Sequence, residues 1–101
     1  TGHANCYGIT PGILRELDVV PLSLHIQDTH GPGYGDEHLL PGDGNIDWKE
    51  FLHILRDVGY KGELVLEAHH QSYDAPDEEK DTILFELLRR AEKMLAYYQS
   101  L

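Results

Sequence analysis

The alternation of apolar and polar residues predicts two short strands in this chain. Residues 22–28 alternate with the period of a strand, which places Ser23, His25 and Gln27 on one polar face. Residues 63–68 form a second short apolar segment that ends in a carboxylate, Glu67, followed by Ala68. Neither strand can bury both of its faces against the other, so we expect the sheet to continue elsewhere.

Three further segments have the spacing of helices. Thr10 and Pro11 suit the N-cap and first turn of a short helix over residues 10–17. Asp47 is the expected N-cap of a second helix, which ends at Gly59. The side chains of this helix that are expected to face the core are Phe51, Leu52, Leu55 and Val58. A long helix over residues 77–100 carries one apolar stripe, formed by Ile83, Leu84, Leu87, Leu88, Ala91, Leu95 and Tyr98. Helices that alternate with strands in this way are typical of parallel α/β units.

Composition narrows the classes of protein that this pattern allows. The 101 residues suit one small domain, and 18 acidic against 8 basic residues give a net charge of -10. This charge disfavours nucleic acid as a partner, because such affinity depends largely on Lys and Arg. No apolar run approaches the roughly 20 residues that span a bilayer, so we expect no membrane partner. A lone cysteine, Cys6, cannot form an internal disulfide, which favours a cytoplasmic location.

Residues 29–44 form a long loop with five glycines, two prolines and no periodicity. Loops of this length inside compact domains are usually functional or disordered. This loop and its first flanking residue carry many groups with chemistry, namely Asp28, His30, Asp36, Glu37 and His38. We therefore expect the loop to take part in a functional site.

Active residues of parallel α/β folds gather at the carboxyl ends of the strands. His25 lies near the end of the first predicted strand, and Glu67 lies near the end of the second. His3 would follow a strand that precedes these residues. An imidazole and a carboxylate on neighbouring strands suit a divalent cation that keeps positions open for substrate.

Four segments resemble one family in order: GHAN at residues 2–5, LHIQD at 24–28, DEHLLPGDGNIDW at 36–48 and GYKGELVLE at 59–67. The chain resembles the carboxyl-terminal part of the xylose isomerase-like TIM barrels, which include the sugar phosphate isomerase/epimerase family and endonuclease IV. The likeness extends to about Ala68, and the final helix matches only in type. It implies that residues 1–101 are the last two to three βα units of a partial (β/α)8 barrel, cut from a longer domain.

The resemblance also implies a role for each site residue. His25 would be a metal ligand, and Glu67 would be both a metal ligand and an acid/base group. His3 would contact substrate oxygens, as in the epimerases, or bind metal, as in endonuclease IV. Asp36 and His38 match a pair that holds an additional metal in endonuclease IV; alternatively, they order the loop through hydrogen bonds. The implied cofactor is a divalent metal ion, either Mn, Mg, Co or Zn.

The implied activity is isomerisation or epimerisation of a small carbohydrate, with or without phosphate, through proton transfer and an enediolate intermediate. Glu67 can supply only one of the two acid/base groups, and a whole barrel takes about 200 residues or more, so the isolated chain is expected to be inactive. One alternative is an endonuclease IV-like zinc phosphodiesterase, which the net charge disfavours. Another is a non-catalytic partial barrel that forms a homo-oligomer or binds the missing barrel half.

Other residues have simpler interpretations. We expect His30 and His53 at the surface, and Trp48 and Tyr60 in the packing of helix against sheet. His69 and His70 suit a solvated loop better than the mouth of a pocket. Acidic residues around the start of the long helix stabilise its N-terminus through their charge and otherwise form a solvated face. They are Asp74, Asp77, Glu78, Glu79 and Asp81.

Overall fold

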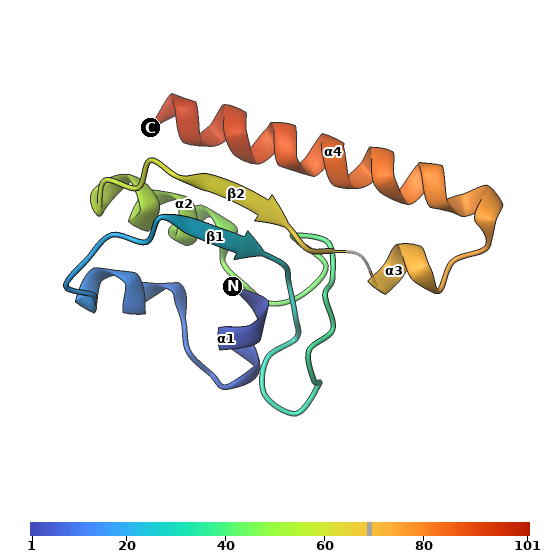
Figure 1. Ribbon diagram of the computed structural model, residues 1–101, viewed down its shortest axis with the longest axis horizontal. Coiled ribbons are helices and arrows are strands. Elements are labelled where there is room, and N and C mark those ends of the chain that lie inside the picture. Colours follow the sequence, from blue (N-terminus) through green and yellow to red (C-terminus); the bar gives the residue numbers. More distant parts are fainter. Residues whose placement is uncertain (69) are drawn as a thin grey trace.

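Both predicted strands form, and they pair in parallel as β1 (Ser23–Ile26) and β2 (Glu63–Leu66). The computed structural model describes residues 1–68 and 70–101 as a mixed α/β structure with a two-stranded sheet (Figure 1). His25 lies opposite Val65 in this sheet. Both strands are shorter than predicted. The first is shorter because Asp28 leaves the sheet and forms an antiparallel bridge with Leu39, and the second ends before Glu67 and Ala68.

The connection between the strands contains the helix α2 (Trp48–Asp57). Its start is the predicted one: the Asp47 side chain accepts a hydrogen bond from the backbone N–H of Glu50 at 2.9 Å. Its end is also as predicted: Gly59 follows the helix with φ +75°, a backbone conformation that residues with a Cβ rarely adopt. The cap residue and the glycine together fix the length of this helix.

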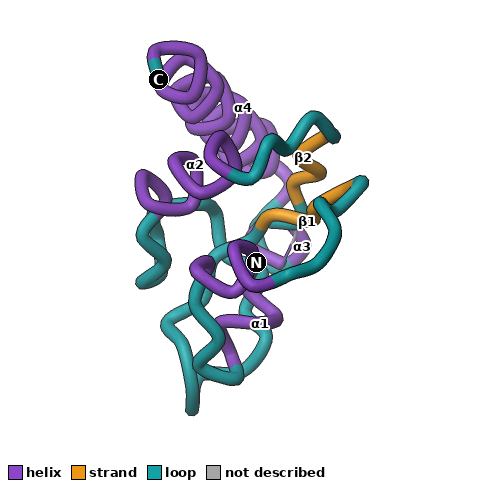
Figure 2. The backbone as a smooth tube through the Cα atoms, turned by 90° about the vertical axis from the view of Figure 1, so that its left-hand side faces the viewer, coloured by secondary structure: helices purple, strands orange, loops and turns teal. Residues whose placement is uncertain are grey.

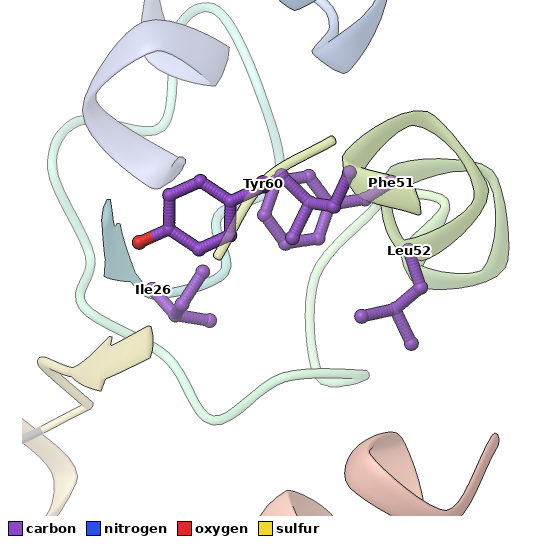
Figure 3. Close-up of a cluster of buried hydrophobic side chains, with 5 residues drawn as sticks. Ile26, Phe51, Leu52 and Tyr60 are labelled. Carbon is purple, nitrogen blue, oxygen red and sulfur yellow. The ribbon is translucent and has the colours of Figure 1, made fainter. Parts of the chain in front are cut away.

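One face of the sheet packs against α2 and forms the hydrophobic core (Figure 2). The buried cluster consists of Ile26, Phe51, Leu52, Leu55 and Tyr60, and Figure 3 shows it as sticks, with all but Leu55 labelled. Tyr60 thus has the packing role expected from the sequence. Ser23 and His25 alternate with Leu24 and Ile26 along β1 and remain exposed on the opposite face. This exposed face carries the polar side chains of the sheet.

The long helix α4 (Asp77–Ser100) has the predicted bounds, but only part of its predicted stripe is covered. Leu84, Leu88 and Leu95 are more than half exposed. Met94 and Tyr97 pack against the core in their place. The expected stripe is therefore wrong in part, because the helix packs beside α2 through a face rotated from the one that sequence spacing favoured.

Three short elements complete the described structure. Pro11–Glu16 form a 3-10 helix, η1, where a short helix was expected; with six residues it closes tight i to i+3 turns. The helices α1 (Gly2–Cys6) and α3 (His70–Tyr73) were not predicted, since neither segment has an apolar period. Within residues 1–68 and 70–101, no helix combines the length and apolar character needed to cross a bilayer.

Candidate functional site

The strands β1 and β2 end at the same edge of the sheet, where their arrowheads lie in Figure 1. Polar side chains meet at this edge. The Nδ1 atom of His25 lies 2.7 Å from Oε1 of Glu67. His25 is paired with Val65, so Glu67 follows two residues later on the same side of the sheet. The His25 side chain is 59% exposed, on the face that α2 leaves open. The two strand ends therefore hold an imidazole and a carboxylate in direct contact, open to solvent.

The long loop brings a second imidazole and carboxylate to the same place. Nε2 of His38 lies 3.0 Å from Oδ2 of Asp36, and its Nδ1 lies 2.9 Å from the backbone oxygen of Glu67. His38 has φ +51°, the single positive value among the non-glycine residues that the structure describes. The pair of Asp36 and His38 is thus attached to the end of β2 through the ring of His38, a residue with an unusual backbone conformation.

His3 approaches the same carboxylate from α1, with Nδ1 at 3.5 Å from Oδ2 of Asp36. The start of α1 is fixed to the end of β1, because the Thr1 hydroxyl donates to the backbone oxygen of Gln27 at 2.6 Å. All five residues expected at the site therefore lie in one connected group, in the order His3, Asp36, His38, Glu67 and His25.

The charge of Asp36 is stabilised by its neighbours. Burial by itself would raise the pKa of this carboxyl, but hydrogen bonds and charges from His38 and then His3 outweigh that effect and lower it. The amide Nε2 of Gln27 also donates to Oδ1 of Asp36 at 3.2 Å. Gln27 is buried, and the sequence indicated its contribution only through its place on the polar face of β1. The neighbours of Asp36 therefore keep the pKa of its carboxyl below that of an ordinary aspartate.

The donors suit a divalent cation as pairs. Both ring nitrogens of His38 face oxygen acceptors, whereas a neutral imidazole donates from only one nitrogen. A ring that donates from Nδ1 to the Glu67 carbonyl turns the Nε2 lone pair toward Asp36, an arrangement that needs a proton or a cation between them. Within the described parts of the chain, however, no three His, Cys, Asp or Glu side chains are arranged to hold one metal ion. The described donors are thus of the kind that divalent metals bind, but they are arranged as pairs and not as a group of three.

The remaining histidines lie outside this connected group or at its margin. His30 pairs with Glu37 on the exposed side of the loop, with Nδ1 at 3.0 Å from Oε2. His53 is partly buried and bonds the Tyr97 hydroxyl at 3.0 Å, so its expected surface position is wrong. His70 is exposed, with its ring centre 4.4 Å from that of His38. The expectation for His69 lies outside the described residues.

The chain belongs to the xylose isomerase-like TIM barrel family, which matches residues 1–91. A protein of Methanocaldococcus jannaschii, described as uncharacterized, is 36% identical over 67 residues. This stretch makes up 65% of the present chain and 23% of the archaeal protein, so the chain spans much less than two thirds of that relative. No solved structure is significantly similar to the chain.

Proposed function

We propose that β1 and β2 are the last two strands of a xylose isomerase-like barrel. Their parallel pairing and the family membership support this placement. In a closed barrel, the sheet face opposite the helices turns inward. Here that face carries Ser23, His25 and Val65. The connected polar group would then lie at the carboxyl-terminal rim, where TIM barrel enzymes have their active sites.

We infer that the site serves metal-dependent isomerisation or epimerisation of a small carbohydrate. The observation that carries this proposal is the 2.7 Å contact between His25 and Glu67 on neighbouring strand ends. A carboxylate held in this way can remove a proton from the carbon beside a sugar carbonyl, which gives an enediolate. His25 orients the carboxylate oxygen for this transfer, and His3, at the exposed end of the group, would contact substrate hydroxyls.

A divalent metal ion would be held by His25 and Glu67, with Asp36 and His38 as a second pair of donors. When bound, such an ion makes the proton beside a carbonyl more acidic. The described residues supply no group of three ligands, so we propose that further ligands and the second acid/base group come from a longer polypeptide or a second copy. The isolated 101 residues are accordingly expected to have little or no turnover.

Binding of Mn²⁺ and proton exchange test this proposal together. Glu67→Gln should abolish Mn²⁺ binding, measured by electron paramagnetic resonance, and should remove any deuterium incorporation from D₂O into ketoses. Glu63→Gln is the matched control, because Glu63 lies on the same face at the opposite end of β2. Equal Mn²⁺ affinity in the wild type and in Glu67→Gln would contradict the assignment.

A second candidate is a zinc-dependent phosphodiesterase of the endonuclease IV type. Asp36 contacts both His3 and His38. These contacts favour the phosphodiesterase, because endonuclease IV uses the corresponding positions as additional metal ligands. The net charge of -10 opposes binding to DNA. Zn²⁺-dependent nicking of supercoiled DNA with abasic sites would reverse the order of the two candidates.

A further inference from the structure

Asp28 lies two residues after the end of β1 and is fully buried, and its carboxylate accepts four hydrogen bonds. Oδ1 accepts from the backbone N–H groups of Thr29 at 2.9 Å and Ile46 at 3.2 Å. Oδ2 accepts from the backbone N–H of Gly42 and from Nε1 of Trp48, both at 2.8 Å. A carboxylate has about four acceptor positions, so these bonds use its capacity. Any effect of Asp28 on chemistry must therefore act through the groups that it binds.

The backbone of Asp28 holds the segment that carries His38. Its N–H donates to the oxygen of Leu39 at 2.9 Å, and its own oxygen accepts from the N–H of Leu39 at 3.0 Å. Leu39 directly follows His38, whose positive φ is unfavourable for a residue with a Cβ. The bridge on one side and the carboxylate bonds to Gly42 and Ile46 on the other keep this conformation in place.

We propose that Asp28 is a positioning residue, which fixes residues 29–46 so that His38 and Asp36 face Glu67. This inference rests on the proposed function, because it assigns the effect of Asp28 to the same site. Direct participation of Asp28 in metal or substrate binding is not part of it, since the carboxylate is enclosed by its four donors. The expected consequence of its loss is a misplaced His38 ring in a chain that remains folded.

Three variants separate positioning from stability. Asp28→Asn keeps the volume of the side chain, but it replaces one acceptor oxygen by an NH₂ group. This group faces N–H donors, so the hydrogen bonds on that side of the carboxylate are lost. Trp48→Phe is milder, because it removes one of the two donors to Oδ2 and leaves the backbone N–H of Gly42 in place, so it decides the matter if Asp28→Asn does not fold. Leu55→Ala is the matched control, because Leu55 belongs to the buried core cluster, which includes neither Asp28 nor a residue of the site.

Two measurements on the full chain are needed: long-range ¹H–¹⁵N spectra of the histidine rings and Mn²⁺ affinity. Asp28→Asn should shift the ring signals of His38 and weaken Mn²⁺ binding by about 10- to 100-fold. Trp48→Phe should produce the same changes to a smaller extent, and Leu55→Ala should leave both unchanged below its melting temperature.

The outcomes separate this inference from the proposed function. Unchanged His38 signals and Mn²⁺ affinity in Asp28→Asn, or equal changes in Leu55→Ala, would overturn the positioning role. If the wild type binds no Mn²⁺, the assignment of its histidines and carboxylates as metal donors fails, and the His38 signals alone then decide the role of Asp28.

Discussion

The loop over residues 29–46 and the helix α4 differ in how regular they are and in how firmly they are held. The helix has 24 residues of regular structure, yet none of them is buried. The loop has no helix or strand, yet Thr29, Leu40 and Ile46 are all buried. Buried polar contacts to Asp28 replace regular hydrogen bonding in the loop. The comparison shows that periodicity along the chain does not measure how firmly a segment is fixed.

The largest difference in the free energy of unfolding is expected between alanine variants of two leucines, one in each region. Leu40 in the loop is 3% exposed, whereas Leu88 on α4 is 55% exposed. Leu40→Ala should lower the free energy of unfolding by about 3 kcal/mol, because it leaves a cavity. Leu88→Ala should change it by less than about 0.5 kcal/mol. Urea denaturation of both variants tests the comparison, and equal losses would contradict it.

A smaller loss is expected when the close packing of the loop is disturbed at Gly44. A Cβ on this residue would overlap the backbone oxygen of Thr29 and Oδ1 of Asp28. Gly44→Ala should therefore destabilise the protein by about 2 kcal/mol, within the range for overpacked sites. The control is Gly12→Ala in η1, where the added Cβ has only ordinary contacts. A loss in Gly12→Ala as large as in Gly44→Ala would show that the loop packing is not the cause.

Arg90 joins α4 to the loop over residues 29–46. From α4, its Nη1 donates to the backbone oxygen of Pro41 at 3.0 Å and to Oδ1 of Asp43 at 2.6 Å. Arg90→Met should lower the free energy of unfolding by about 1 kcal/mol and speed hydrogen exchange in residues 41–45. Arg89→Met is the control, because Arg89 pairs with Glu86 on the helix itself. Unaltered exchange in Arg90→Met would show that the loop does not depend on α4.

The elements with local signals could be predicted from the sequence. The start of α2 depends on Asp47 and its end on Gly59, and both act within a few residues of their position. The rotation of α4 could not be predicted, because Met94 and Tyr97 meet a core assembled from distant segments. The helices α1 and α3 lack an apolar period, so their sequences gave no signal.

The candidate site was predictable to a similar extent. The contact between His25 and Glu67 follows from the alternation of two parallel strands, which places both residues at neighbouring ends. The bond from His38 to the Glu67 backbone depends on a positive φ and on the bridge between Asp28 and Leu39. Such features arise from loop geometry, for which the sequence shows only glycines, prolines and polar residues. The sequence thus predicted which residues meet, but not what holds them together.

The smallest expected effect concerns the pH dependence of α4. Arg89 and then Arg90 lower the pKa of Glu86 from 4.5 to about 2. A carboxyl whose pKa is lower in the folded state stabilises the fold above its unfolded pKa, and this contribution is lost as the pH falls from about 4.5 toward 2. Glu86→Gln should therefore be slightly less stable than the wild type at pH 7, and the difference should vanish near pH 2.

Urea denaturation at pH 7, 4 and 2.5 checks this expectation, with Glu92→Gln on the exposed side of α4 as control. Added salt should reduce the difference at pH 7, because surface ion pairs are screened. A difference at pH 2.5 as large as that at pH 7 would mean that the Glu86 side chain acts through packing. Because Arg90 also binds Asp43, a pH effect that extends to hydrogen exchange of residues 41–45 would show that α4 holds the loop through this charged cluster.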